Sequence, residues 1–303
     1  MIPFQRLKLS QKDQYESILF SVPPRGCEYS FVNLCLWGQQ QVAFLHGCVA
    51  FFSHYYGRSV YPYPIGNGDR RAVLEEIFRD ARDRGIPCRI TGMRDADRAE
   101  LEAWFPGKFH IRANRDSCDY VYAIDDLADL KGRKYQKKRN HVNRFRAEHP
   151  AFQVVPLTEC NMGQAQAMLN DWFLRRLQED PDGDYLLENI ALARACQNYG
   201  RLNLDGILLM DQGRVLAVTM GSRLSPDTFD IHFEKAREDV EGAYTVVNQE
   251  FARYLRLKYP EAAYLDREDD MGLEGLRKAK LSYNPHHLIE KHTATCMEDL
   301  HDD

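Results

Sequence analysis

The chain has 303 residues, of which 44% are hydrophobic and 28% charged, so it is long enough to bury the cores of two domains. Its net charge of −5 at neutral pH argues against a protein that coats nucleic acid with its whole surface, although a local basic patch stays compatible with it. The sequence has no run of 18 apolar residues and no N-terminal apolar segment of signal-peptide length. We therefore expect a cytoplasmic protein with no transmembrane segment.

The eight cysteines are widely spaced and never occur as Cys-x-x-Cys. This spacing predicts buried free thiols in a reducing compartment and argues against a disulfide framework or a zinc site. His46 and His54 are isolated and have no metal-ligand partner at a telling spacing, and the sequence predicts no bound metal.

The first half of the chain alternates strand and helix patterns and is predicted to be a mixed α/β unit. Its clearest amphipathic helix covers residues 70–84, with Asp69 as the N-cap and Gly85 as the stop. The other predicted elements are strands at 2–7, 86–90, 109–112 and 120–124, two or three strands within 42–64, and helices at 10–20, 29–41 and 95–105.

Residues 131–146 are strongly basic, since eight of the sixteen are Lys or Arg and none is acidic. Only Tyr135, Val142 and Phe145 form an apolar stripe, which predicts a surface helix. One interpretation is a landing site for RNA phosphate or an anionic membrane surface; the other is a linker helix whose charges pair with nearby acids. The candidate anion-binding residues are Arg133, Lys134, Lys137, Lys138 and Arg144.

The second half is predicted to run strand, two helices, a three-strand antiparallel meander, helix, strand, short helix and strand. The strands are expected at 152–157, 205–210, 215–223, 227–236, 262–265 and 286–296, and the helices at 162–177, from Pro181 to 200, at 243–258 and after Gly272.

A row of charged residues follows the strand at 262–265, and a basic helix comes next. Acids at the end of a strand beside basic side chains are able to hold a zwitterionic ligand, although a charge run is also typical of a solvated loop. The candidate substrate-binding residues are Asp266, Arg267, Glu268, Asp269, Lys278 and Lys280.

Lys280 falls on the same helix side as Leu273 and Leu276, which are expected to face inward. A buried ammonium needs an anionic partner, so we expect Lys280 beside one of these acids or Glu234 and next to a pocket. The alternative is that the helix frays or that the side chain reaches water along its own stem.

The order of elements in the second half resembles the acetyltransferase fold of the GNAT superfamily, and the first half is a looser version of it. A closer likeness lies in residues 28–34 with Trp37, 134–144, 232–236, 241–244 with 248–251, and 267–269 through 276–283. In these segments the chain resembles the C-terminal, cytosolic domain of phosphatidylglycerol lysyltransferases and its free-standing bacterial relatives.

This resemblance implies mixed sheets in two tandem acetyltransferase-like domains, at residues 1–145 and 146–303. In the lysyltransferases, the activity moves an aminoacyl group from charged tRNA to a lipid headgroup. The resemblance also implies a role in substrate binding for Asn248. The sequence shows nothing like the membrane half of those enzymes, so the acceptor stays open.

Acyl transfer to an amine needs a base for its proton and donors for the oxyanion. Glu234 ends a strand of the meander, where this fold places its base, although an ion pair with a neighbouring cation would also explain it. Tyr283 is a candidate proton donor to the leaving group or a packing residue. No Cys/His or Ser/His/Asp spacing indicates a covalent mechanism.

Three hypotheses follow: an acyl or aminoacyl transferase with a large carrier such as tRNA and a small amine or amino-acid-like substrate, a coenzyme-A-dependent N-acyltransferase, and a non-catalytic binding module. The loop at 237–243 has one glycine and three acids, which disfavours binding of the coenzyme A pyrophosphate. The sequence therefore predicts no cofactor.

Overall fold

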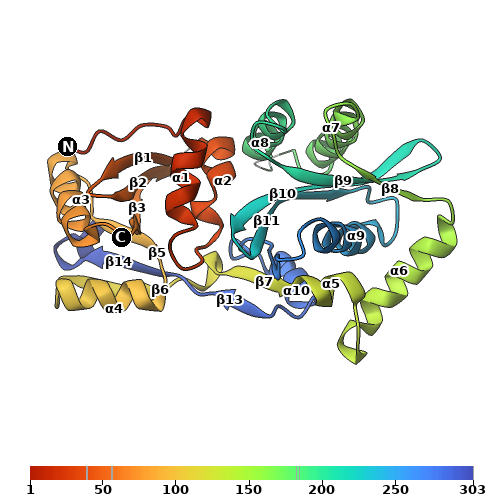
Figure 1. Ribbon diagram of the computed structural model, residues 1–303. Coiled ribbons are helices and arrows are strands. Elements are labelled where there is room, and N and C mark those ends of the chain that lie inside the picture. Colours follow the sequence, from red (N-terminus) through yellow and green to blue (C-terminus); the bar gives the residue numbers. More distant parts are fainter. Residues whose placement is uncertain (39, 56, 182, 184, 303) are drawn as a thin grey trace. The chain divides into compact units, whose positions relative to one another are not determined.

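The computed structural model describes residues 1–38, 40–55, 57–181, 183 and 185–302. They form a mixed α/β structure with two mixed sheets, which confirms the predicted mixed α/β class (Figure 1). The helices are α1 (Lys12–Leu19), α2 (Phe31–Trp37), α3 (Arg70–Arg84), α4 (Asp95–Trp104), α5 (Ile124–Asp129), α6 (Gln136–Glu148), α7 (Met162–Glu179), α8 (Leu186–Gln197), α9 (Ala243–Lys258) and α10 (Glu274–Leu281).

The first sheet has the strand order β1-β2-β3-β5-β14-β6, with β4 paired to β2. Its pairs are antiparallel except β3 with β5. The strands are β1 (Gln40–Leu45), β2 (Cys48–Tyr55), β3 (Arg58–Pro62), β4 (Ile65–Gly66), β5 (Arg89–Met93), β6 (Phe109–Ala113) and β14 (His292–Cys296).

The second sheet has the order β13-β7-β12-β11-β10-β9-β8. β11 and β12 run parallel, while the meander β9-β10-β11 is antiparallel as predicted. The strands are β7 (Asp119–Ala123), β8 (Gln153–Pro156), β9 (Asp205–Asp211), β10 (Arg214–Ser225), β11 (Thr228–Ala236), β12 (Tyr264–Asp266) and β13 (His287–Ile289).

The chain divides into two compact units, each made of more than one segment. The N-terminal unit comprises Met1–Asp119, Asp269–Arg277 and Leu288–Asp303, and the C-terminal unit comprises Tyr120–Glu268 and Lys278–His287. Nearly all of β7 therefore belongs to the second unit, and β14 to the first. The two contiguous domains at 1–145 and 146–303 stay a prediction. The two units are groups of residues that pack compactly, and compact packing does not define which segments fold independently.

The core of the N-terminal unit lies between α3 and the first sheet. α3 buries Val73, Leu74 and Ile77 against strand residues that include Tyr61 and Ile90. The helix begins and ends as predicted: the Asp69 side chain accepts a hydrogen bond from the backbone N–H of Ala72 at 2.9 Å, and Gly85 ends it with a φ of 65°.

In the C-terminal unit, α7 and α8 lie over one face of the second sheet and α9 over the other (Figure 1). The register between β10 and β11 shifts where Met220 pairs with Phe233 and Gly221 pairs with Ile231. His232 therefore lies at a β-bulge, a feature that changes the direction of a side chain.

The structure corrects some sequence expectations. The final strand expected at 286–296 is two strands in different sheets, β13 and β14. Residues 2–7 make only an isolated bridge, Gln5 with Val42, and the second helix of the C-terminal half begins at Leu186. Among the described residues, no helix is both long and apolar enough to cross a membrane.

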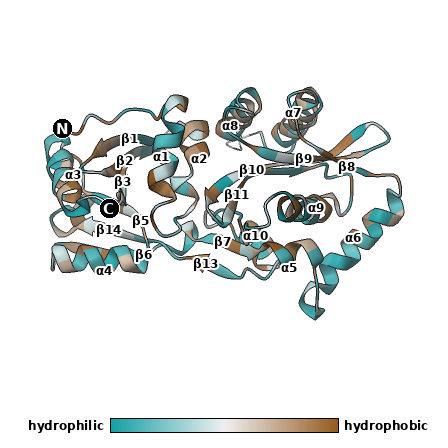
Figure 2. Ribbon diagram, viewed as in Figure 1, coloured by the Kyte–Doolittle hydropathy of each residue, from teal (hydrophilic) through white to brown (hydrophobic). Residues whose placement is uncertain are grey.

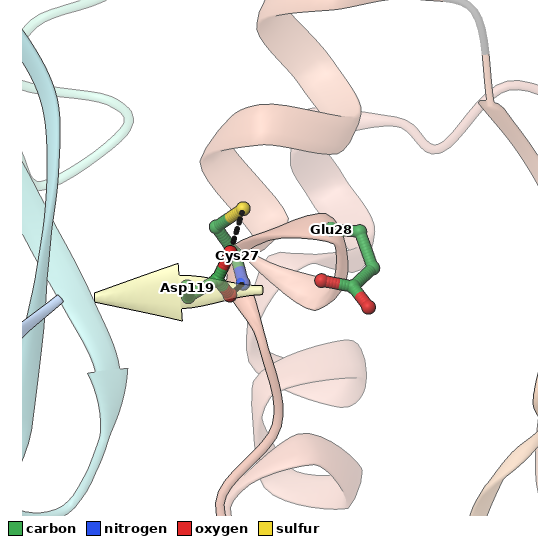
Figure 3. A group of neighbouring side chains, drawn as sticks. All are labelled: Cys27, Glu28 and Asp119. Atoms are coloured by element: carbon green, nitrogen blue, oxygen red, sulfur yellow. Dashed lines mark hydrogen bonds between the residues drawn. The ribbon is translucent and has the colours of Figure 1, made fainter. Parts of the chain in front are cut away.

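The break between β13 and β14 is explained by a buried charge at Lys291. Its ammonium lies 2.6 Å from Glu28 Oε2 and 2.8 Å from Asp119 Oδ1, and its side chain is only 5% exposed. The thiol of Cys27 also approaches Asp119, at 3.4 Å (Figure 3). A Cβ on Gly26 would collide with both carboxylates, so the chain packs directly against this cluster.

We expect Lys291→Met to lower the stability of the N-terminal unit by about 3–5 kcal/mol, because the buried Asp119 and the partly buried Glu28 would lose their cation. Hydrogen exchange of the β14 amides measures this loss within the unit. Lys131→Met is the control, because Lys131 is an exposed lysine paired with Asp129, and it should change little. Equal effects of the two substitutions would contradict the assignment.

Candidate functional site

Glu234 lies near the end of β11 and is bound by side chains from two other segments of the C-terminal unit. Arg267, just after β12, places its Nη2 2.8 Å from Glu234 Oε1. Asn248, on α9, donates from Nδ2 to Glu234 Oε2 at 3.2 Å. The ion pair expected as an alternative is therefore present, with Arg267 as the cation, while the adjacent Lys235 pairs instead with Glu188 of α8.

Aromatic rings enclose this ion pair. The Arg267 guanidinium lies 5.0 Å from the Tyr283 ring centre and 5.8 Å from that of Tyr122. Lys138, on α6, also reaches Tyr283: its ammonium lies 3.5 Å from the centre of the Tyr283 ring. The Tyr283 ring thus lies close to two cations, and its hydroxyl lies 3.5 Å from Thr245 Oγ1 on α9.

Burial changes the acid–base properties of these groups. It raises the pKa of the Tyr283 phenol, with Arg267 partly opposing the rise. Burial, together with the charge of Arg267, lowers the pKa of Lys138 to about 8, and Glu234 opposes this fall. At neutral pH the site therefore holds a protonated phenol and an ammonium that is easily deprotonated.

Two polar atoms beside Glu234 are buried and have no hydrogen-bond partner among the described residues: Arg267 Nη1, a donor, and Asn248 Oδ1, an acceptor. Buried polar groups are nearly always paired, so such atoms need an explanation, and a ligand is one. Because Asn248 Nδ2 must face the Glu234 carboxylate, the direction of the Asn248 amide is set by that contact.

A cavity of about 370 Å³ lies at the start of α9 in the same unit. Lys138 and Thr245, which contact Tyr283, are among its lining residues, as are His141 and Arg237. The first backbone N–H groups of a helix favour an anion there. The acids of the loop at 237–243 are paired with arginines: Glu238 with Arg176, Asp239 with Arg214 and Glu241 with Arg144. Their predicted repulsion of a phosphate is therefore reduced.

Lys280 is 8% exposed, in agreement with the burial expected for it. Its ammonium donates hydrogen bonds to the backbone carbonyls of Arg267 and Glu268, which it holds together, and it also lies 5.7 Å from the Tyr120 ring centre. It lines none of the described cavities. Tyr122 donates to the Lys280 carbonyl at 2.8 Å, so this turn of α10 is fixed against β7.

The other predicted binding residues have different surroundings. Asp266 is fully buried and accepts from the Glu268 N–H at 2.8 Å, closing a local turn. Asp269 falls in the N-terminal unit, and Lys278 is exposed. The roles of all these residues in binding stay predictions.

The basic segment begins with a 3₁₀ turn at Arg133–Tyr135, and α6 itself starts at Gln136. It is hydrophilic along its length (Figure 2). Several of its charges are paired within the unit: Lys134 with Asp126 at 2.9 Å, and Arg144 with Glu241 at 2.6 Å. Arg133 in the 3₁₀ turn and Lys137 on α6 are exposed and make no ion pair with the described residues, so both are available to an external anion.

Sequence reasoning did not find three polar residues near this site, Ser222, Asp230 and His232, which are buried on β10 and β11. The alternation of Asp230, His232 and Glu234 along one strand was the available signal. This alternation does not by itself indicate a site, because the β-bulge at His232 and the residues of the neighbouring strand decide which side chains meet.

Comparison with known proteins gives a consistent result. The family model described as "Phosphatidylglycerol lysyltransferase, C-terminal" matches residues 20–295. A crystal structure of a conserved protein of unknown function from Bacteroides thetaiotaomicron is 36% identical, with a TM-score of 0.91, and the match covers 98% of this chain and 100% of that chain. L-PGS from Bacillus licheniformis is 14% identical with a TM-score of 0.65, over 94% and 91% of the two chains, which shows likeness of fold.

An uncharacterized protein of Mycoplasmoides gallisepticum is 26% identical over 200 residues, which are 64% of this chain and 61% of that protein. The chain therefore spans less than two thirds of the length of this relative.

The surroundings of Lys138 lead to a prediction about its titration. We expect a pKa of about 8 for this lysine, and a further fall in Glu234→Gln, because the carboxylate favours the ammonium form. NMR of isotope-labelled lysine side chains measures the titration. Asp126→Asn removes a carboxylate bound to Lys134 and should leave the pKa of Lys138 unchanged. A rise of this pKa in Glu234→Gln would show that the two groups do not interact as described.

Proposed function

Because the chain belongs to the family of phosphatidylglycerol lysyltransferase C-terminal domains, we propose that it is an aminoacyltransferase that takes its acyl group from a large carrier such as charged tRNA. The acceptor is a small amine or a hydroxyl group. The candidate site in the C-terminal unit supports this proposal.

The observation that carries it is the pair of unpartnered atoms beside Glu234. Arg267 Nη1 offers a hydrogen-bond donor and Asn248 Oδ1 an acceptor, on the two residues that bind the carboxylate. An aminoacyl ester carries the complementary groups, a carbonyl oxygen that accepts and an α-ammonium that donates. An acetyl group has the carbonyl alone and would leave Asn248 Oδ1 unpaired.

The same residues fit the steps of transfer. The acceptor attacks the ester carbonyl while Glu234 takes its proton, and Arg267 stabilises the oxyanion that forms. When the carbon–oxygen bond to the carrier breaks, the Tyr283 hydroxyl donates a proton to the leaving oxygen, and the proton held by Glu234 restores the phenol through the acceptor or water. The raised pKa of Tyr283 suits this role, because the phenol stays protonated at neutral pH.

The cavity at the start of α9 supports a phosphate-bearing donor, because Lys138, His141 and Arg237 line it beside the helix N-terminus. Transfer RNA and coenzyme A share this chemistry. Arg133 and Lys137 favour the larger polyanion, since they extend the basic surface along α6.

We expect Glu234→Gln to reduce the rate of transfer by roughly 10²–10⁴-fold, because the acceptor proton loses its base. Arg267→Lys should reduce it by about 10²–10³-fold, because a lysine cannot supply both hydrogen bonds of the guanidinium. The measurement is loss of the aminoacyl ester from a mixture of all aminoacyl-tRNAs, with phosphatidylglycerol vesicles or small amines as acceptors.

Glu261→Gln is the matched control, because this exposed glutamate pairs with Arg223 away from the site, and its rate should equal that of the unaltered protein. Absence of any acceleration by the unaltered protein would contradict aminoacyl transfer. Micromolar binding of acetyl-coenzyme A in calorimetry would instead support the coenzyme-A-dependent alternative.

Removing two exposed cations of the basic segment, Arg133 and Lys137, tests the carrier separately. Arg133→Ala with Lys137→Ala should weaken binding of tRNA and reduce the slope of log affinity against log salt by roughly one to two, the effect of losing up to two phosphate contacts. Filter binding at several salt concentrations measures it. The control is Arg6→Ala with Lys8→Ala, which removes equal charge from the N-terminal unit and should leave the slope of log affinity against log salt unchanged. Identical slopes in the two double variants would rule out the basic segment as the landing site for tRNA.

A further inference from the structure

The N-terminal unit contains a cavity of about 600 Å³, a size that is typical of small-molecule sites. One wall is part of α3 with the loop that follows it, and another is the turn after α4. The end of β14 and the 3₁₀ helix Met297–Asp302 form the third. All of the lining residues belong to the N-terminal unit, whereas the candidate site around Glu234 lies in the C-terminal unit.

Apolar side chains form much of the cavity lining. The rings of Phe78 and Phe105 lie with their centres 4.8 Å apart and are nearly perpendicular, at 79°. Both side chains line the cavity and are only half-buried, as are those of the neighbouring Ile86 and Pro87. An apolar ligand group that covers these side chains would remove their exposed area from water, which favours binding.

A tight turn places the Lys108 ammonium over the two rings. Pro106 and Gly107 occupy the central positions of this turn, Gly107 with a φ of 70°, and the Lys108 N–H donates to the Phe105 carbonyl at 3.2 Å. Proline followed by a glycine with positive φ is typical of a type II turn. The ammonium consequently lies 3.9 Å from the Phe78 ring centre and 5.8 Å from that of Phe105.

Three cations line the cavity without a carboxylate partner. Arg79 and Arg82 are three residues apart on α3 and therefore lie on the same side of the helix, and Lys108 comes from the turn. None of the three makes an ion pair with the side chains that the structure describes; Arg79 donates only to the backbone carbonyl of Glu75, at 3.4 Å. Beside an apolar surface, a cation attracts an anion more strongly than it does in open water.

The acids of the lining are mostly engaged by other groups. Glu75 pairs with Arg71, which does not line the cavity, at 3.3 Å. Asp299 accepts the backbone N–H of Cys88 at 2.8 Å, which holds the C-terminal 3₁₀ helix against the start of β5. Among the described lining residues, Glu298 is the acid that remains without such a contact. The lining therefore has an excess of uncompensated positive charge, which suits an anionic ligand.

We propose that this cavity binds a small organic acid, in which a carboxylate is joined to an alkyl chain or an aromatic ring. The carboxylate binds the Lys108 ammonium with Arg82 as a second donor, and the apolar part lies against Phe78 and Phe105. A single negative charge suits the cavity, since Glu298 would repel a ligand that carries more. The proposal concerns the N-terminal unit and does not depend on aminoacyl transfer in the other unit.

Isothermal titration calorimetry of the full chain with phenylpropionate and with octanoate tests the proposal. We expect saturable binding of both acids. Acetate lacks the apolar part and phenylpropanol lacks the charge, so each should bind at least about 10-fold more weakly, as should inorganic phosphate. Phosphate or acetate binding as tightly as the two larger acids would overturn the proposal, because the apolar contacts would then have no role.

Lys108→Met keeps a side chain of similar length over the rings and removes its charge. It should weaken binding of both acids by roughly 10–100-fold, because a charge-assisted hydrogen bond is lost. Lys8→Met is the matched control, because Lys8 is an exposed lysine of the same unit that does not line the cavity, and this variant should bind as the unaltered protein does.

Equal binding by the Lys108→Met and Lys8→Met variants, or no saturable binding of either acid by the unaltered protein, would contradict the assignment. The comparison of ligands uses the unaltered protein, so its result stands even where Lys108→Met unfolds. Because the readout is binding in the N-terminal unit, its outcome is separate from that of the aminoacyl-transfer assay.

Discussion

The ion pair between Arg267 and Glu234 is the interaction on which the candidate site depends. Both side chains are mostly enclosed by protein, and a buried charge without a partner costs several kcal/mol. The pair therefore fixes the segment after β12 against β11. Because Asn248 of α9 binds the same carboxylate and the Tyr283 ring lies beside the guanidinium, two further segments are placed by one electrostatic requirement.

The same requirement explains the less regular parts of the N-terminal unit. Lys291 interrupts what would be one strand, because its ammonium is drawn to Glu28 and Asp119. In each unit, then, a buried cation lies just after a strand: Arg267 binds one carboxylate from a distant segment, and Lys291 binds two. A site that positions a cation and carboxylates in this way has low flexibility, which suits catalysis that depends on preorganised hydrogen bonds.

Local pattern was sufficient for much of the fold. The helix at 70–84 was predicted with its cap and stop, because Asp69, Gly85 and the apolar spacing all act within a few residues. The β9-β10-β11 meander was predicted because its turns are short. Four residues of the site were named from the sequence, largely because of the family resemblance: Glu234, Arg267, Tyr283 and Lys138. The structure brings these four together.

What the sequence determined by itself was therefore the class of fold, the family and the residue types available to the site, since these depend on periodicity and on local motifs. Only the tertiary structure decided which charges meet. Lys134 and Arg144 are paired within the unit while Arg133 and Lys137 face solvent, a distinction that composition does not contain. Likewise Ser222, Asp230, His232 and Glu268 became a cluster only through a β-bulge and a parallel strand pair, because contacts between strands depend on register and not on distance along the chain.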